Sequence, residues 1–526
     1  MGIGSRESGV GTRESGLGSR ESGIGNRESG VGVRRKFTVP RQYDKPYKLF
    51  AQVYYYLLST TCSPHLPISP SPHLPKLPTL LLLLPFASCL LPFPAIRVFT
   101  TEIQTCLVMT YRRISYAVWE ITLKCNLACQ HCGSRAGHTR AKELSTEEAL
   151  DMVRQMAEVG ITEVTLIGGE AFLRPDWLEI AKAITDAGMV CGMTTGGFGI
   201  SLETARRMKE AGIRVVSVSV DGLEATHDRL RGRKGSWQWA FKTMSHLKEA
   251  GIPFGCNTQI NRLSAPQFPE IYQLLRDAGI FAWQIQLTVP MGNAADNYDI
   301  LLQPYELLDV YPMIARVVER AYSEGVKVQA GNNIGYYGPY ERLLRGRGES
   351  DPWTFWQGCQ AGLSTLGIEA DGVIKGCPSL PTSAYTGGNI RDHSLRTIIE
   401  ETEELRFNLG ADTPKGTSHL WGFCKTCEFA ELCRGGCSWT AHVFFDRRGN
   451  NPYCHHRALT QASQGIRERF VPKVKAQGLP FDNGEFEIIE EPINTPWPNN
   501  DPLHFTADRI QWSEHWQDQK ELVASL

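Results

Sequence analysis

Residues 115–137 read SYAVWEITLKCNLACQHCGSRAG, a β-branched run that leads directly into three cysteines within eight residues, Cys125, Cys129 and Cys132. Three thiolates can hold three irons of a 4Fe–4S cluster and leave the fourth iron open for a ligand. Zinc is the alternative, because it also binds C-x2-C pairs. It would need a fourth ligand, however, and His131 is too close in sequence to serve comfortably beside both neighbours. The spacing therefore favours a reactive cluster over a structural metal site.

The same run is the first of six apolar or β-branched segments that alternate with helical patterns: residues 115–122, 163–169, 190–197, 215–221, 253–260 and 282–290. The helices between them end at glycines suited to a left-handed C-cap, namely Gly160, Gly188, Gly212, Gly251 and Gly279. A sixth helix, from about Tyr305 to Glu324, ends at Gly325. This alternation predicts an α/β fold with a parallel sheet, either an open doubly wound sheet or a partial (β/α)6 barrel similar to a TIM barrel.

The position of the cysteines agrees with the barrel. No G-x-G-x-x-G follows the first strand, which weakens the dinucleotide-binding version of a doubly wound sheet. In a barrel the loop after the first strand lies at the C-terminal ends of the strands, where such folds carry their chemistry. Two further cysteines, Cys191 and Cys256, fall inside predicted strands and are expected to be ordinary core residues.

Residues 1–108 differ in composition from the rest of the chain. Residues 2–35 repeat with a period of seven that contains two glycines per unit, which excludes a coiled-coil seam, and residues 63–75 repeat SPHLP. Residues 77–96 are uncharged and long enough to span a bilayer, but their prolines argue against a regular helix. We expect a low-complexity, disordered extension, or translated upstream sequence with Met109 as the natural start. A membrane anchor is the alternative.

The cysteine spacing resembles that of the radical S-adenosylmethionine (SAM) superfamily. In that family the amino and carboxylate groups of SAM chelate the open iron of a 4Fe–4S cluster. An electron from the cluster then cleaves the sulfonium, and the resulting 5′-deoxyadenosyl radical takes hydrogen from the substrate. The resemblance implies that Cys125, Cys129 and Cys132 bind this cluster.

Further stretches are similar to motifs of the same family. The sequence GGE at Gly168, Gly169 and Glu170 is similar to the motif that meets the SAM amino group. Ser219, Asp221 and Arg231 match polar contacts to ribose and carboxylate, and an arginine suits a carboxylate because its fork binds two oxygens. Residues 289–292 (VPMG) look like the backbone that cradles adenine. Gly196 stands where the family has asparagine in a T-N-G turn, which puts that contact in doubt.

A second set of cysteines lies in the C-terminal half at intervals that resemble the SPASM domain, an extension that carries auxiliary 4Fe–4S clusters. By this resemblance one cluster is bound by Cys359, Cys377 and Cys437, and the other by Cys424, Cys427, Cys433 and Cys454. No cysteine lies between Cys256 and Cys359, so the first auxiliary cluster is expected to have an open iron or a non-cysteine ligand. Two zinc sites are the alternative. Disulfides are less favoured, since no secretory signal indicates an oxidising compartment.

These patterns divide the chain into four predicted parts. Residues 1–108 are the extension, 109–335 the radical SAM barrel, 336–470 the SPASM domain with auxiliary clusters, and 471–526 an acidic C-terminal tail. From Phe481 onward the chain holds 10 Asp and Glu against 2 Lys and Arg. A solvated tail is the default interpretation; covering the cluster domain or docking a partner is the alternative.

The predicted function is that of a cytoplasmic radical SAM/SPASM enzyme that modifies a ribosomally made peptide or protein. The alternative is a small-molecule radical SAM oxidoreductase, such as one that modifies tetrapyrrole side chains. A non-catalytic zinc module is a remote third possibility. The resemblance implies an electron donor of the ferredoxin or flavodoxin type. A separate leader-binding partner is a further hypothesis, and no nucleic acid is expected. No general acid or base can be named from the sequence.

Overall fold

The computed structural model describes residues 114–345, 355–409, 414–498 and 501–512. The predicted extension at residues 1–108, with its uncharged segment 77–96, lies outside these residues, as does Met109. None of the helices in the described ranges has the length and apolar character needed to cross a bilayer.

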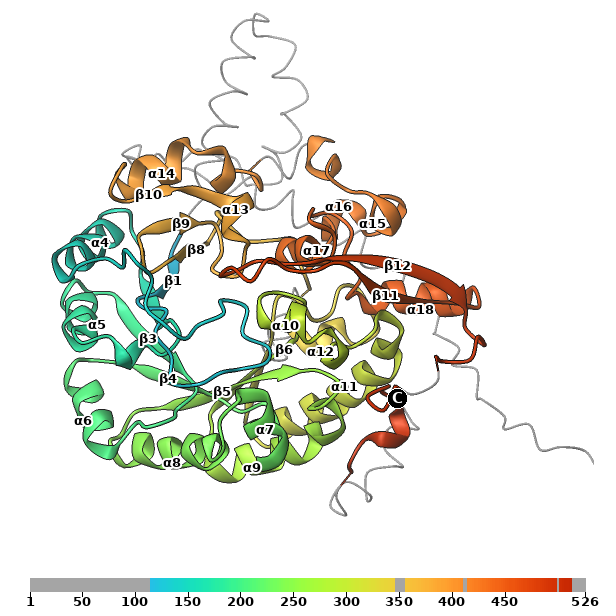
Figure 1. Cartoon of the computed structure of the whole chain (residues 1–526), viewed down its shortest axis with the longest axis horizontal. Coiled ribbons are helices and arrows are strands. Elements are labelled where there is room, and N and C mark those ends of the chain that lie inside the picture. The colour runs from blue at the N-terminus through green and yellow to red at the C-terminus, as the bar shows by residue number, and fades with distance from the viewer. Residues whose placement is uncertain (1–113, 346–354, 410–413, 499–500, 513–526) are drawn as a thin grey trace, which may run out of the picture. The chain divides into compact units, whose positions relative to one another are not determined.

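A ten-stranded sheet organises the described chain (Figure 1). Its strands lie in the order β10-β9-β8-β1-β2-β3-β4-β5-β6-β7, and neighbouring strands from β8 to β7 run parallel, whereas β9 and β10 are antiparallel additions. The first seven strands are β1 (Tyr116–Glu120), β2 (Glu163–Ile167), β3 (Val190–Thr195), β4 (Val215–Ser219), β5 (Phe254–Ile260), β6 (Ala282–Leu287) and β7 (Lys327–Ala330). The predicted α/β barrel fold is confirmed, and the six predicted strands are β1 to β6; β7 was not predicted.

Helices cover the outer side of the parallel strands (Figure 1). They are α4 (Thr146–Glu158), α5 (Trp177–Asp186), α6 (Leu202–Glu210), α7 (Glu224–Arg231), α8 (Ser236–Glu249), α9 (Phe268–Ala278) and α11 (Leu307–Ser323). The short helix α10 (Asn293–Asp296) lies instead on the inner side, in the segment that follows β6 (Figure 1). Helix α4 shows why they form where they do. Ser145 and Glu148 make a reciprocal capping box at its start, and its apolar residues recur at helical spacing, so one face is buried against the sheet.

The two sides of the barrel strands differ in character. On β1, Ala117 and Trp119 are buried toward the helices, whereas Tyr116 and Val118 on the inner side are partly exposed. The inner positions of β4 to β6 are polar and partly exposed as well: Ser217, Asn257, Gln284 and Gln286. A closed TIM barrel fills its interior with branched apolar side chains. This barrel instead keeps a polar inner face that is available to a ligand. Cys191 and Cys256 are buried on the outer side, as predicted.

The sheet continues across the boundary predicted at residues 335 and 336. Strand β8 (Thr365–Ile368) pairs in parallel with β1, with Thr365 opposite Tyr116, and β9 (Val373–Lys375) and β10 (Thr386–Asn389) follow it. The helices of this part are α12 (Glu341–Arg345), α13 (Thr382–Tyr385), α14 (Leu395–Glu401), α15 (Gly422–Thr426), α16 (Ala430–Cys433), α17 (Ser438–Phe445) and α18 (His455–Ser463). The cysteine-rich segment is therefore joined to the barrel through the sheet itself.

The prediction of a solvated tail from residue 471 is wrong for the described part of that segment. Strand β11 (Ile466–Val474) runs through the predicted boundary and pairs antiparallel with β12 (Glu485–Pro492). Phe486 on β12 is buried and lies 5.8 Å, between ring centroids, from Phe444 of α17. The acidic composition of this segment conceals apolar residues that pack on the rest of the chain.

Arg262 fastens the last described residues to the barrel. Its guanidinium lies 2.8 Å from Glu306 Oε1 and 2.8 Å from Asp501 Oδ2. Glu306 is fully buried, and its Oε1 also accepts a hydrogen bond from the main-chain N–H of Phe505. Arg262 therefore compensates the buried charge of Glu306, and Glu306 in turn provides an acceptor for the buried main-chain N–H of Phe505.

Replacing Arg262 by Ala should lower the free energy of unfolding by about 3–5 kcal/mol, because Glu306 would remain buried without a counter-charge. A matched control is Arg206→Ala, which breaks an exposed pair with Glu249 and should cost at most about 1 kcal/mol. Thermal and denaturant unfolding of the two variants measure the difference. Equal destabilisation by both would contradict this account of the tail.

Candidate active site

The three cysteines of the loop after β1 lie together with hydrogen-bond donors at their sulfurs. The main-chain N–H groups of Leu127 and Ala136 lie 3.4 Å from the sulfurs of Cys125 and Cys132, respectively. Burial raises the pKa of Cys125 and of Cys129 to about 12, and negative charge on Cys132 raises both further. Buried thiols ionise readily only beside positive charge, which the irons of a cluster would supply. The donor set thus fits the predicted cluster.

Neighbouring main chain holds this loop so closely that several positions have no room for a side chain. A Cβ on Gly168 would lie 2.3 Å from Thr122 O, and one on Gly169 would lie 2.4 Å from Lys124 O and 2.7 Å from Cys125 Cβ. The main-chain N–H of Gly169 donates to Thr122 O at 2.9 Å. The predicted GGE motif is therefore brought directly against the cysteine loop, and its glycines are required by this contact.

Two other turns close on the same loop. A Cβ on Gly232, which follows α7, would lie 2.2 Å from Ala128 O, and one on Gly292 would lie 2.4 Å from Cys132 O. Both glycines have positive φ, 62° and 57°. The Asn293 side chain donates to Cys129 O at 2.9 Å. Residues 289–292, expected to cradle adenine, thus border the cysteine loop.

Glu170 is buried at the end of the GGE motif. Its carboxylate accepts hydrogen bonds from Thr195 Oγ1 at 2.5 Å and from Gly196 N–H at 2.6 Å. Burial raises its pKa to about 7, although both hydrogen bonds lower it. Position 196, where the family has asparagine, contributes a main-chain donor to Glu170, and a Cβ there would lie 2.4 Å from Leu127 Cδ1, so Leu127 would have to move to admit a side chain.

Arg231, predicted to bind the SAM carboxylate, lies beside the cysteines but is already engaged. Its guanidinium lies 2.5 Å from Asp221 Oδ2 and donates to Cys129 Sγ at 3.8 Å. The same Asp221 oxygen lies 2.9 Å from His131 Nε2. Burial raises the pKa of Asp221, but Arg231 and His131 outweigh it and hold that pKa well below its usual range. His131, considered from the sequence only as a zinc ligand, is thus part of a buried ion cluster. Ser219 is the last residue of β4, two positions before Asp221, and its side chain is buried.

The structure places neighbouring thiols beside Cys437 and Cys433, while the two predicted ligand sets stay predictions. Burial raises the pKa of Cys437, and the nearby Cys359 and Cys377 raise it as well; burial also raises the pKa of Cys433, with contributions from the nearby Cys454, Cys424 and Cys427. The second group lines a cavity with Tyr336, Tyr337, Phe423, Phe429 and His456. Among the described residues no three His, Cys, Asp or Glu side chains lie close enough to share a single metal ion. The proximity of the cysteines within each group is therefore seen in their effects on one another's pKa and, for the second group, in the cavity that they line. The thiol sets fit auxiliary clusters, whose presence stays a prediction.

Aromatic residues lie between the two groups of cysteines and contact both. Tyr336 Oη accepts a hydrogen bond from Cys437 N–H at 3.2 Å, and Trp356 Nε1 donates to Cys433 O at 3.1 Å. The two rings meet edge to face at 5.2 Å. Trp439 reaches the other way, with Nε1 at 3.0 Å from Met291 Sδ in the turn that borders the cysteine loop. The auxiliary segment therefore touches the predicted SAM site.

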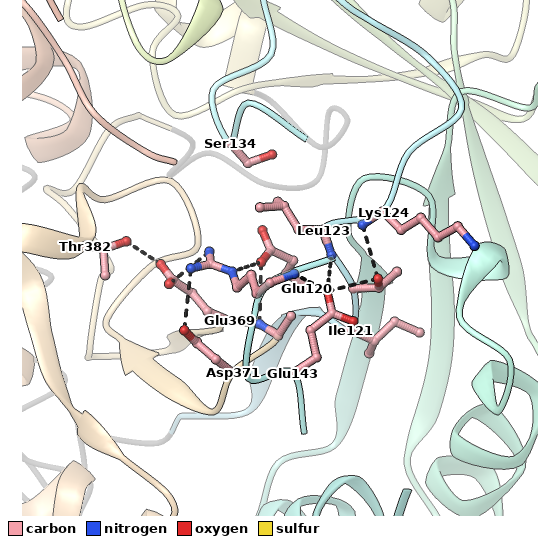
Figure 2. A network of polar contacts seen from close by, with 12 residues as sticks. Glu120, Ile121, Leu123, Lys124, Ser134, Glu143, Glu369, Asp371 and Thr382 are labelled. Carbon is pink, nitrogen blue, oxygen red and sulfur yellow. Dashed lines mark hydrogen bonds and ion pairs between the residues drawn. The ribbon is translucent and has the colours of Figure 1, made fainter. Parts of the chain in front are cut away.

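A buried network of charges joins β1 to the strands of the auxiliary segment (Figure 2). Arg140 lies 3.0 Å from Glu120 Oε1 and 3.1 Å from Glu369 Oε2. Glu369 Oε1 in turn lies 2.6 Å from the fully buried ammonium of Lys375 and accepts from Thr382 Oγ1 at 2.5 Å. Figure 2 shows Glu120, Glu369, Asp371 and Thr382 converging on this network. It links the strand before Cys125 to the strand before Cys377. This network was not predicted, because its central pair, Arg140 and Glu369, joins residues over 200 positions apart.

The chain was compared with known proteins on this basis. The family model described as "Radical SAM superfamily" matches residues 119–275. An "AdoMet-dependent heme synthase" of Nitratidesulfovibrio vulgaris is 30% identical over 352 residues, which cover 64% of this chain and 91% of the relative. A protein of the same name from Methanosarcina barkeri is 28% identical over 360 residues, covering 64% and 95%.

A protein named as a maturase and a structure with a bound peptide are similar as well. The "mycofactocin maturase MftC" of Mycolicibacterium smegmatis is 27% identical over 328 residues, covering 61% of this chain and 76% of the relative. Among solved structures, "Native anSMEcpe with bound AdoMet and Kp18Cys peptide" superposes with a TM-score of 0.51 at 17% identity, covering 66% of this chain and 94% of that one. At this identity the structural likeness shows the shared fold.

Replacing Gly169 by Ala should abolish assembly of the cluster at Cys125, because the new methyl group would lie within 3 Å of Lys124 O and Cys125 Cβ. Iron bound by the auxiliary cysteines should remain. Gly137→Ala is the matched control, since a Cβ at Gly137 in the same loop meets nothing within 4 Å. Iron content, electron paramagnetic resonance (EPR) of the reduced protein and 5′-deoxyadenosine formation test this. Equal iron loss in both variants would contradict it.

Glu120 should make the stability of the protein depend on pH. Burial raises its pKa to about 7, Glu369 raises it further, and Arg140 and Lys375 lower it. Because the unfolded chain releases this proton near its ordinary pKa of about 4.3, the free energy of unfolding should fall as pH rises from about 4.5 to about 7. Glu120→Gln removes this loss, so relative to the unaltered protein it should gain about 1–3 kcal/mol between pH 5 and pH 8. Melting temperatures of both proteins across this range test it; a difference independent of pH would refute it.

Proposed function

The chain belongs to the radical SAM superfamily, and we propose that within this family it is an enzyme that modifies the side chains of an iron tetrapyrrole. The observation that carries the proposal is the likeness to proteins named AdoMet-dependent heme synthase at 28% and 30% identity, over 95% and 91% of their lengths. A likeness of this extent includes the barrel and the auxiliary cysteine segment together.

The residues around the cysteine loop account for the first half of the proposed reaction. When bound at Cys125, Cys129 and Cys132, the cluster and SAM would supply the 5′-deoxyadenosyl radical. The buried carboxylate of Glu170, oriented by Thr195 and Gly196, would meet the SAM amino group. Arg231 would hold Cys129 through its sulfur contact and Asp221 at the same time, so it would fix the loop rather than bind the SAM carboxylate alone.

The polar side chains on the inner face of the barrel support a substrate that itself carries polar groups. Asn257, Gln284 and Gln286 offer uncharged amide donors and acceptors on adjoining strands. Such amide groups can bind the carboxylates of a tetrapyrrole without adding a charged protein side chain near the radical site. The cysteines of the auxiliary segment would bind the two predicted auxiliary clusters beside this face. The predicted electron donor of the ferredoxin or flavodoxin type stays a prediction.

The peptide or protein substrate predicted from the sequence is the second candidate. The likeness to mycofactocin maturase MftC favours it, although that match covers 76% of the relative. A separate leader-binding partner would belong to this candidate alone. The two candidates differ in substrate and share the radical chemistry, so one set of reagents can separate them.

The test is a reaction of anaerobically reconstituted protein with SAM, a reductant and Fe-coproporphyrin III, whose propionates stand where heme has two vinyl groups. Conversion of a propionate to a vinyl group releases carbon dioxide, gives one hydrogen atom to the 5′-deoxyadenosyl radical and leaves one electron, which an iron–sulfur cluster bound at the auxiliary cysteines would accept. We expect mass loss from the tetrapyrrole in step with 5′-deoxyadenosine, and neither with a Cys125→Ala variant. Formation of 5′-deoxyadenosine with unchanged tetrapyrrole, and modification of a precursor peptide instead, would overturn the proposal in favour of the second candidate.

A further inference from the structure

The turn between β11 and β12, residues 475–484, reaches the cysteine loop although it is more than 340 residues away in sequence. In Figure 1 the red β11–β12 ribbon extends toward the barrel beside α10. The main-chain N–H of Phe481 donates to Gly133 O at 3.2 Å, directly after Cys132. Asp482 O accepts from Gly292 N–H at 2.8 Å, and Asn483 forms an antiparallel bridge with Met291. One short turn thus binds both loops that border the predicted SAM site.

The side chain of Asp482 strengthens this contact. Its Oδ1 accepts from Arg135 Nε at 2.8 Å, and Arg135 belongs to the loop after Cys132. Arg135 also binds Asp296 of α10 and donates to Asn293 Oδ1. Asp482 Oδ2 accepts from the N–H groups of Gly478 and Leu479, which closes the turn on itself. The carboxylate is therefore held rigidly while it holds Arg135.

The ring of Phe481 points inward to the charge network. The ammonium of Lys375 lies 3.9 Å from the ring centroid, and the guanidinium carbon of Arg140 lies 5.7 Å from it. Phe481 is 9% exposed, whereas Leu479 in the same turn is 57% exposed. Its φ of 58° lies in the left-handed region, which a bulky residue rarely adopts. The contacts with the two cations give the ring a specific position in spite of this unfavourable backbone conformation.

We infer that Phe481 and Asp482 are positioning residues of the radical site, which fix the loop after Cys132 against the turn at Met291 and Gly292 and thereby shape the place where SAM binds. Phe481 further ties this place to Lys375 and Arg140, and so to the strand that leads to Cys377. The inference rests on family membership and does not depend on the tetrapyrrole substrate. The turn at residues 475–484, which was predicted to belong to a solvated tail, thus has a function in the radical site.

The test compares five variants of the full chain without any substrate. Phe481→Ala should raise the dissociation constant for SAM by about 10-fold, since the turn loses the ring contacts with Lys375 and Arg140 that hold it in position between the two loops. It should also change the EPR spectrum of the reduced cluster with SAM added, while the iron content and auxiliary signals stay unchanged. Phe481→Tyr, which keeps the ring, should restore both readouts. Asp482→Asn, which removes the charge that holds Arg135, should weaken SAM binding in the same direction.

Glu487→Ala is the matched control, because Glu487 is exposed on β12 of the same hairpin and away from the turn. It should leave SAM binding and the EPR spectrum unchanged. If Phe481→Ala fails to fold, Phe481→Leu decides, since it keeps apolar volume and removes the aromatic face. Normal SAM affinity and an unchanged spectrum in Phe481→Leu and Asp482→Asn would overturn the inference. Because no substrate is present, a failure here is distinct from a failure of the tetrapyrrole proposal.

Discussion

The close approach of main chain to the cysteine loop is the constraint on which the site depends. Three separate turns, at Gly169, Gly232 and Gly292, meet this loop at distances that admit no Cβ. They come from different parts of the barrel, after β2, α7 and β6. A loop enclosed by backbone on three sides has little freedom to move, and main-chain hydrogen bonds replace the side-chain contacts that glycine cannot make. The rigidity needed to hold three thiols at fixed separations thus comes from the barrel and not from the loop itself.

Buried charge is the second feature that organises the site. Asp221 lies between His131 and Arg231 beneath the loop, and Glu120 and Glu369 share Arg140 beside it. Burying such pairs brings a desolvation penalty that their mutual attraction barely repays, so they contribute more to a defined arrangement than to stability. Here the arrangement joins segments that are far apart in sequence. Arg231 connects α7 to Cys129, and Arg140 connects β1 to β8. The ion pairs therefore set the relative positions of the two cysteine-bearing regions.

Much of the fold could be predicted from the sequence because its signals are local. Strands β1 to β6 are short apolar runs, and glycines such as Gly279 end the helices between them, so each element carries its own pattern. Strand β7 escaped prediction because its four residues include an exposed lysine and an exposed glutamine. Strand β12 escaped because EFEIIEEP is dominated by charge, while Phe486 is buried by contacts with distant residues. What could not be predicted is what depends on those distant contacts.

The same distinction applies to the site. The predicted grouping of the C-terminal cysteines rests on the resemblance of their spacing to the SPASM domain, and that spacing can be read along the chain without knowledge of distant contacts. The absence of asparagine at position 196 could be noticed from the sequence, but the proximity of Leu127, about seventy residues earlier, could not be predicted. Proteins named AdoMet-dependent heme synthase and mycofactocin maturase are both similar to this chain, so the radical site alone does not determine the substrate. We therefore expect substrate choice to depend on side chains that face the inner side of the barrel. Those of β5 and β6 are amides, while the charges of Arg140 and Lys375 are engaged by Glu120 and Glu369. An anionic group entering there would meet amide donors first, and the paired charges would limit how deeply it could enter.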